Sequence, residues 1–425
     1  MGRLGAAFAF LLIAPALVLK KARNAWAEPD RVSAPEAKTA SNLNSLVAAE
    51  PCMDYNEERV FGAVRKALED IRFEIPPGKR VLLKPNIMAQ NKPDQAASTH
   101  PAVVGALCRL FREKGCDVTI GDSSAFYQGG GTRLGLETTG MAEVARKYGA
   151  KLLPFEAALL RKVETGRVVN PLYITEAVYT HDIVVNIPKL KIHRLARYSG
   201  AVKNTYGCVV GGTKQLYHKL FSSRPDYQEY WGKPLVDVYE AVNPALNVMD
   251  AITGLDKDGP AANGKPRETG VILVSRSGPA LDIAACRMIG FDPLWVPALR
   301  EAIERKLALP EEVSVIGQLP VIAPYVKLPD LKPKSGFSKS FDDFTFDQFI
   351  MKPEVKRSRC GGCSVCVTSC VPGAMSLDKD GKAVIDDSKC IRCYCCSEFC
   401  PKQAVSLHGG VTNHAMRGMR VILGL

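Results

Sequence analysis

Nine of the fourteen cysteines in this 425-residue chain lie between Cys360 and Cys400. Eight of them form two copies of one pattern, C-x2-C-x2-C-x3-C, offset by 30 residues. In order, the copies comprise Cys360, Cys363, Cys366 and Cys370, then Cys390, Cys393, Cys396 and Cys400. A disulfide framework spreads its cysteines through a small chain, whereas cysteines gathered this closely indicate a metal or cluster site.

The spacing suits an iron–sulfur cube. A turn that offers three thiolates two residues apart can hold one face of the cube, and a distant segment must supply the fourth. The repeat therefore resembles the two-cluster 4Fe–4S ferredoxin domain of the bacterial type, in which the fourth cysteine ligates the cluster of the other half. This implies two 4Fe–4S clusters, one held by Cys360, Cys363, Cys366 and Cys400, the other by Cys390, Cys393, Cys396 and Cys370.

Three details bear on this assignment. Zinc ribbons also use clustered cysteines, but they use two C-x2-C pairs rather than a triplet and a lone fourth. Cys395 is extra, and it is either a spectator thiol or a substitute for a neighbouring ligand. Pro401 follows Cys400 directly, whereas Val371 separates Cys370 from its proline.

Upstream of the cysteines, strand and helix signals alternate between residues 45 and 325. This alternation predicts an α/β domain with a mostly parallel sheet and flanking helices. Asn56 is expected to cap a helix, and Pro101 and Pro279 are expected to open two more. Apolar strands are expected at 79–86, 117–124, 182–190 and 270–276.

Polar residues stand where these strands end, which is where such sheets bind ligands. The cations are expected in loops after apolar runs, where gathered lysines would bind a carboxylate or phosphate. His193 or His218 could move a proton beside an electron transfer, and Asp122 could orient a lysine or hold a metal. The catalytic candidates are Lys189, Lys191 and His193, and the other pocket candidates are Lys84, Asn86, His100, Asp122, Lys203, Asn204 and His218. The alternative is that these residues are separate surface charges that never meet.

Together the polar runs resemble the domain-of-unknown-function 362 family, whose uncharacterised members are often fused to a C-terminal ferredoxin domain. The likeness covers roughly residues 45–325. It rests on Lys84-Pro85-Asn86, Thr99-His100-Pro101, Gly121-Asp122-Ser123, Pro188-Lys189-Leu190-Lys191, His193, Lys203-Asn204, Gly207, His218, Asp250 and Gly259-Pro260. The resemblance implies the α/β architecture and a cluster-bearing redox role, but no particular reaction.

The net charge of +12 is unevenly distributed. The segment from His181 to Lys233 contains nine Lys and Arg residues but only three acidic ones, whereas the charges of the cysteine-rich segment cancel. A basic stretch of this kind attracts anions. Nucleic acid is not the expected partner, because Gly and apolar residues interrupt the stretch. The glycines at 129–133 lack the spacing of a phosphate-binding P-loop and are expected to form a flexible loop.

The N-terminal run from Leu4 to Leu19 is uncharged. A helix of that length spans about 24 Å, less than the ~30 Å core of a bilayer. Lys20, Lys21 and Arg23 follow the run and resist translocation. The protein is therefore expected in the cytoplasm or attached to the cytoplasmic face of a membrane. An exported form, cleaved after a signal sequence, is the alternative.

We expect five segments: an apolar segment and linker (1–44), the α/β domain (45–325), a linker (326–355), the cluster domain (356–410) and a tail (411–425). The pattern predicts an iron–sulfur oxidoreductase or redox subunit acting on an anionic small molecule held by the α/β domain. The alternative is a non-enzymatic electron-transfer, redox-sensing or maturation module that docks a partner protein.

Overall fold

The computed structural model describes residues 42–125, 131–165, 167–222, 224–257, 259, 264–331 and 350–409. The apolar run at 4–19, residues 332–349 of the expected linker and the tail from 411 onward lie outside the described residues. Within the described ranges, no helix is both long and apolar enough to cross a membrane.

A ten-stranded sheet forms the centre of the larger domain, in the order β12-β1-β11-β10-β7-β2-β3-β4, with β8 and β9 attached through β10. The predicted, mostly parallel sheet is confirmed: the antiparallel pairs are β1 with β11, β10 with β11 and β8 with β9. The strands on the main path are β1 (Leu46–Pro51), β2 (Arg80–Pro85), β3 (Asp117–Asp122), β4 (Lys151–Pro154), β7 (Ile183–Ile187), β10 (Leu246–Lys257), β11 (Gly264–Ser275) and β12 (Ser314–Gly317).

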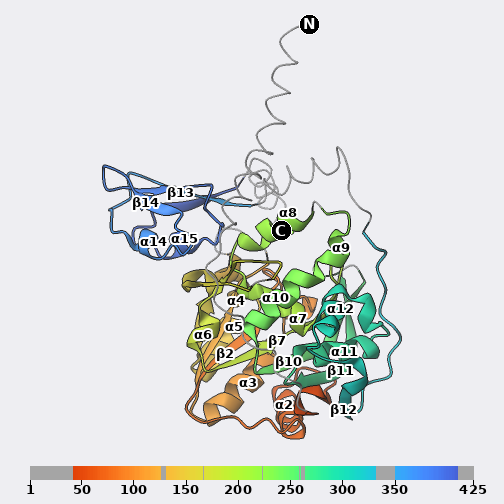
Figure 1. The fold of residues 1–425 in the computed structure, drawn as a ribbon. Helices are drawn as coiled ribbons and strands as arrows, with labels where there is room; N and C mark the ends of the chain where they lie inside the picture. Colours follow the sequence, from red (N-terminus) through yellow and green to blue (C-terminus); the bar gives the residue numbers. More distant parts are fainter. Residues whose placement is uncertain are drawn as a thin grey trace, which may run out of the picture.

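Helices cover both faces of this sheet (Figure 1). Side chains alternate along the strands, so Leu82 joins the core on one face and Leu83 the core on the other. One face is covered by α2 (Glu57–Asp70), α3 (Pro101–Glu113) and α5 (Met141–Tyr148); the other is covered by α10 (Gly232–Val242), α11 (Gly278–Met288) and α12 (Pro297–Glu304).

The expected helix starts are found. The Asn56 side chain accepts a hydrogen bond from the Arg59 backbone N–H and so caps α2. Pro101 opens α3, where a missing N–H costs nothing. Helix α11 begins one residue before Pro279, because Ser277 provides its cap.

The single strand expected at 182–190 is wrong. Strand β7 ends at Ile187, and a second strand, β8 (Lys189–His193), follows Pro188. Proline has no N–H to donate, and its carbonyl accepts from Asp250 instead. The break lets β8 pair with β10 beyond the residues of β10 that pair with β7, and with β9 (Arg197–Ser199).

The C-terminal unit repeats itself in structure as well as in sequence. Its helices α14 (Val365–Thr368) and α15 (Cys395–Glu398) follow residues with the same left-handed backbone, Ser364 and Tyr394. Strand β13 (Lys352–Val355) pairs with β16 (Val405–His408), and β14 (Met375–Leu377) pairs with β15 (Ala383–Ile385).

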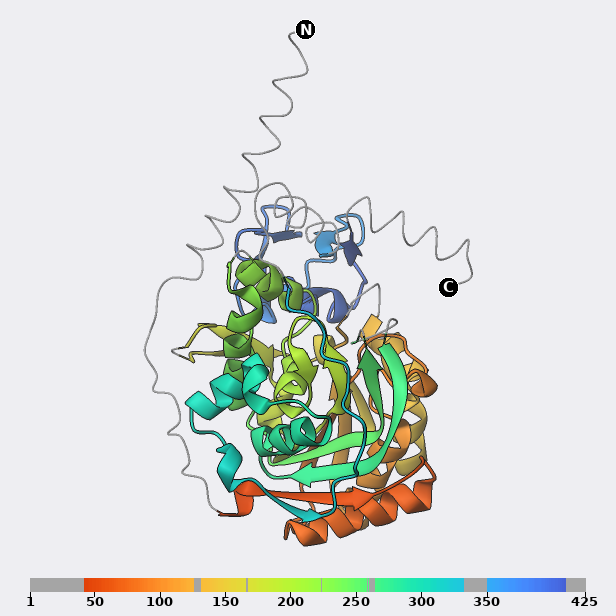
Figure 2. The same cartoon turned by 90° about the vertical axis from the view of Figure 1, so that its right-hand side faces the viewer.

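This unit docks on the α/β domain through its second half, at the end of the domain where α8 (Thr213–Ser222) lies (Figures 1 and 2). The Gly212 N–H donates to the Arg392 carbonyl at 2.8 Å, and the Thr213 hydroxyl donates to the Ile391 carbonyl at 2.7 Å. Glu398 forms an ion pair with Arg133 at 2.8 Å. Arg133 lies on α4 (Gly131–Thr138), so the end of the expected 129–133 loop is helical; Gly129 and Gly130 lie outside the described residues.

Gly212→Val is expected to weaken this docking, because a Cβ at residue 212 would lie closer than 3.0 Å to the Tyr394 ring. Overpacking of this kind costs about 1–3 kcal/mol, so limited proteolysis should release the C-terminal unit roughly tenfold faster or more. Gly361→Ala is the matched control, since a Cβ there meets nothing within 4 Å. Equal release from both variants would contradict the docking.

Candidate functional site

The site lies at the carboxyl ends of the central strands. The expectation that its cations lie in loops is wrong, because Lys84 is on β2, and Lys189, Lys191 and His193 are on β8. Lys203 and His218 are on helices, α7 (Ala201–Asn204) and α8 respectively. Regular structure therefore fixes the direction of each of these side chains.

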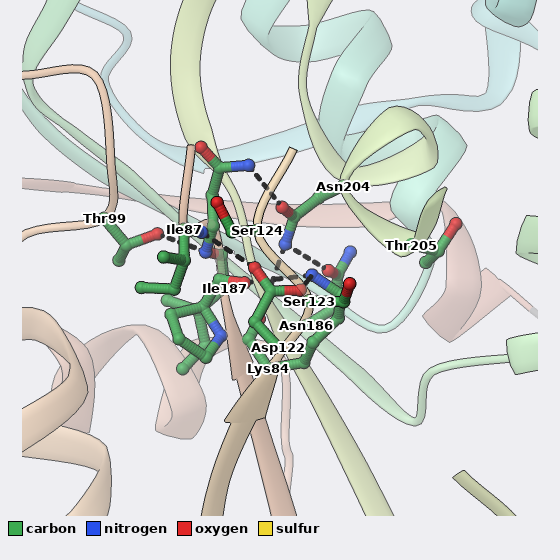
Figure 3. A network of polar contacts seen from close by, with 12 residues as sticks. Lys84, Ile87, Thr99, Asp122, Ser123, Ser124, Asn186, Ile187, Asn204 and Thr205 are labelled. Atoms are coloured by element: carbon green, nitrogen blue, oxygen red, sulfur yellow. Dashed lines mark hydrogen bonds and ion pairs between the residues drawn. The ribbon is translucent and has the colours of Figure 1, made fainter. Parts of the chain in front are cut away.

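Lys84 and Asp122 form a sealed ion pair at the ends of the neighbouring strands β2 and β3 (Figure 3). The Lys84 Nζ and Asp122 Oδ1 atoms are 2.7 Å apart, and both side chains are buried. The Ile87 N–H donates to the other carboxylate oxygen of Asp122 at 2.7 Å. Gly207 closes the space, since a Cβ there would lie 2.6 Å from the Lys84 Nζ. We infer that this pair is structural and does not touch a ligand.

Amide side chains extend from this pair (Figure 3). The Asn204 side chain donates to Asn186 at 2.8 Å and accepts from Asn86 at 2.9 Å. Asn186 in turn donates to Asn247 at 2.9 Å. An amide both donates and accepts hydrogen bonds, so these linked asparagines satisfy one another's buried polar atoms without a charged group. It holds Asn86 in place, and the Asn86 side-chain oxygen remains directed at Lys191.

A second buried pair joins Lys189 to Asp250 at 2.8 Å. The Tyr55 hydroxyl accepts from Lys189 and donates to Asp250, each at 2.9 Å. The His100 ring stacks on Tyr55 with centroids 3.6 Å apart, and burial lowers the pKa of His100 to about 4. Lys189 is therefore held by its own carboxylate, and we assign it a structural role rather than a catalytic one.

Lys191 is different, because it is buried without a carboxylate. Its Nζ atom donates to the Asn86 side-chain oxygen at 2.6 Å and to the Ala97 carbonyl at 2.8 Å. Burial lowers its pKa well below the usual value, and the charge of Lys203 lowers it further. The structure thus brings Lys191, Asn86 and Lys203 together.

Two histidines share this region. The His193 Nδ1 atom accepts from the N–H groups of Leu195 and Ala196, so its proton is on Nε2. His218 stacks on Trp231 with centroids 4.1 Å apart, and its Nδ1 atom is 2.9 Å from the Tyr227 hydroxyl. Burial lowers the pKa of both rings, that of His218 to about 3, and the charge of Lys203 adds to the effect. Both imidazoles are neutral at neutral pH.

A further polar cluster includes residues that the sequence did not single out. Lys214 donates to the Ser123 and Ser124 carbonyls at 2.8 and 3.2 Å, and burial lowers its pKa to about 8. Glu156 is buried and accepts from Ser123 and Thr132 at 2.6 and 3.0 Å. The only hint was the run Gly121-Asp122-Ser123, which ends at this cluster.

In the C-terminal unit, a small hollow is lined by sulfurs from both halves, those of Cys360, Cys363, Cys366 and Cys400. Burial raises the pKa of the Cys396 thiol, and the sulfurs of Cys393, Cys390 and Cys370 raise it further, so this second set also gathers. The two distant members accept matching hydrogen bonds of 3.2 Å, Cys370 from the Ala374 N–H and Cys400 from the Ala404 N–H.

Each donor set consists of four cysteine side chains. In the described residues, no three His, Cys, Asp or Glu side chains are grouped as the ligands of one metal ion would be. Four thiolates are the donors of iron–sulfur clusters and of structural zinc sites. Cys395 belongs to neither set: it is buried against the α/β domain, with its thiol 3.7 Å from the Ala158 carbonyl.

Comparison with known proteins shows to which family the larger domain belongs. A family model described as a domain of unknown function, DUF362, matches residues 81–287. The chain is also 32% identical over 235 residues to the thylakoid-associated protein sll1697 of Synechocystis sp., covering 55% of this chain and 70% of that protein. The chain belongs to the DUF362 family.

Among solved structures, the DUF362 domain is similar to the lactate racemase apoprotein of Thermoanaerobacterium thermosaccharolyticum. The two share 14% identity with a TM-score of 0.37, over 60% of this chain and 59% of that one.

Lys84→Met is expected to destabilise the protein by about 3–5 kcal/mol, because it leaves the Asp122 charge buried and unpaired. Urea unfolding would measure the loss. The double variant Lys84→Met/Asp122→Asn should recover part of it. Lys151→Met, which breaks the exposed pair with Asp117, should cost about 1 kcal/mol or less. Equal costs for Lys84→Met and Lys151→Met would contradict the buried pair.

Acid should destabilise the protein partly through His218. The pKa of His218 in the folded state, about 3, lies below the ordinary value of 6.5. Between these two values the unfolded chain binds a proton at His218 and the folded chain does not. The free energy of unfolding therefore falls as pH drops below about 6.5 and levels off near the folded pKa. His218→Gln should lose less stability than the wild type between pH 7 and pH 4.5 in urea unfolding. Parallel losses would refute a neutral buried ring.

Proposed function

We propose that this DUF362 protein is an iron–sulfur electron-transfer protein with two 4Fe–4S clusters in a ferredoxin-type C-terminal unit. One observation carries the proposal: a single hollow is lined by three cysteines of the first loop and by Cys400 of the second. Crossed sharing of this kind is what a duplicated cluster-binding loop requires. When bound, such clusters supply one-electron transfer.

The chain's own contacts give the unit a direction. Cys395 and Ile391, beside the second cysteine set, belong to the same apolar core as the DUF362 domain. Cys363, in the first set, is exposed. The set containing Cys390, Cys393, Cys396 and Cys370 thus faces the domain, and the set containing Cys363 faces outward. We infer that electrons pass between an external redox partner and the DUF362 domain by way of the outward-facing set and then the set that faces the domain, or in the reverse direction.

The inner set lies close to the polar site. Gly211 donates to the Ser123 hydroxyl at 3.2 Å, and the next residue, Gly212, donates to the Arg392 carbonyl. The same short loop therefore touches the end of β3 and the second cysteine loop. This continuity supports an oxidoreductase or redox subunit whose anionic substrate is held near Lys191 and Lys203, with the Nε2–H of His193 as a hydrogen-bond donor to that substrate.

A second candidate is a module that exchanges electrons with a partner protein and performs no chemistry of its own. The exposure of Cys363 favours it, because electron transfer between proteins needs an accessible cluster. A screen of small carboxylates and phosphates by thermal shift separates the two candidates: a ligand favours the enzyme, and none favours the module. For either candidate, we propose a location in the cytoplasm or on the cytoplasmic face of a membrane, with an exported form as the alternative.

Anaerobically prepared protein is expected to contain about eight irons and eight sulfides per chain. Cys400→Ala should reduce the iron to about four, because it removes one ligand of the first set only. Cys370→Ala, its counterpart in the repeat, should do the same to the second set. Cys395→Ala is the matched control and should keep about eight irons. Zinc in place of iron, or full iron in Cys400→Ala, would overturn the assignment.

A further inference from the structure

Lysines outnumber acids at the buried edge of the DUF362 sheet. The acids that face these lysines are Asp122, Asp250 and Glu156, all buried. Three acids against five lysines leave two lysines without an acid. The five lysines, four of them buried and Lys203 half-buried, are Lys84, Lys189, Lys191, Lys203 and Lys214.

The excess can be assigned to particular residues. Asp122 and Asp250 neutralise Lys84 and Lys189 by direct contact. Glu156 acts on Lys214, whose pKa it raises against the effect of burial. Asp282 is also buried nearby, but it is occupied by the backbone N–H groups of Ala201 and Val202 at the start of α7.

Lys191 and Lys203 remain. Lys191 contacts only neutral oxygens, and Lys203 has no hydrogen-bond or ion-pair partner in the described part of the chain. Burial lowers the pKa of Lys203 to about 8, and the charges of Lys214 and Lys84 contribute. A buried charge without a counter-charge costs several kcal/mol, so these two amines favour losing their protons until an anion arrives.

Part of this cluster retains exposed surface. Asn86, His193, Lys203 and His218 are all half-buried, whereas Lys191 is buried. The His193 Nε2–H and the Lys203 amine are donors with no acceptor among the described residues. Such donors suit the oxygens of a carboxylate or phosphate.

We propose that this site takes a small molecule with two negative charges, one matched to Lys191 and one to Lys203, and that binding is accompanied by proton uptake. The inference rests on the proposed function, since it names the class of anion that the same site would hold. A dicarboxylate and a phosphate share the required chemistry, and a monocarboxylate leaves one amine unmatched.

Titration calorimetry of the full chain near pH 8 tests this, with succinate, inorganic phosphate and acetate as probes. Two buffers of different ionisation enthalpy reveal proton uptake as a difference in the observed heat. We expect at least one of the two dianions to bind about tenfold or more tightly than acetate and to take up protons. Succinate binding alone would assign dicarboxylates, and phosphate binding alone would assign phosphorylated compounds. Acetate binding as tightly as both, no proton uptake, or no binding of either dianion would overturn the inference.

Lys203→Met should abolish the preference for a dianion and reduce the proton uptake, since only Lys191 remains to take up a proton. Lys151→Met, which removes an exposed lysine, should change neither. Iron is measured on the same samples and in Cys400→Ala, so the two proposals can fail separately. Dianion binding to protein that lacks iron would support this inference and refute the clusters. Full iron without dianion binding would do the reverse.

Discussion

A single loop of thiolates can surround three corners of an iron–sulfur cube but not the fourth, and under the proposed function this constraint explains why the C-terminal unit is a repeat. The unit folds as two matching halves, and in each a short strand, β14 or β16, follows the last cysteine. Gly362 and Arg392, and likewise Ser364 and Tyr394, adopt the same left-handed backbone 30 residues apart. The sequence repeat is therefore also a repeat of geometry.

A second constraint governs the larger domain: a charged group that is removed from water needs a counter-charge, from the protein itself or from a ligand. Lys84 and Lys189 have their aspartates and stabilise the meeting of strands that are distant in sequence. Lys191 and Lys203 have none among the residues that the structure describes, and they lie beside neutral histidines and the half-buried Asn86. In our account, the paired lysines build the framework and the unpaired ones bind the ligand.

The parts of the fold that depend on local signals could be predicted from the sequence. The Asn56 cap, the proline that opens α3 and the alternation of strands and helices are properties of neighbouring residues. The cysteine spacing is equally local within each half. The break at Pro188 was missed because the residues on both sides of it are largely apolar and predict one strand. Only the pairing of β8 with β10 shows that there are two strands.

The roles of the site residues could not be predicted in this way. Lys84 and Lys191 look alike in sequence, since each follows an apolar run. What separates them is Asp122 on the neighbouring strand and the close approach of Gly207, which are tertiary facts. Glu156 and Lys214 were missed for the same reason: they meet only through Ser123 at the end of β3.

The most direct test of the account is anomalous diffraction at the iron absorption edge, on crystals grown without oxygen. The account predicts two separate iron peaks in the C-terminal unit. One should be enclosed by Cys360, Cys363, Cys366 and Cys400, and the other, against the DUF362 domain, by Cys390, Cys393, Cys396 and Cys370. A single peak, or two peaks each enclosed by the four cysteines of one loop, would contradict it.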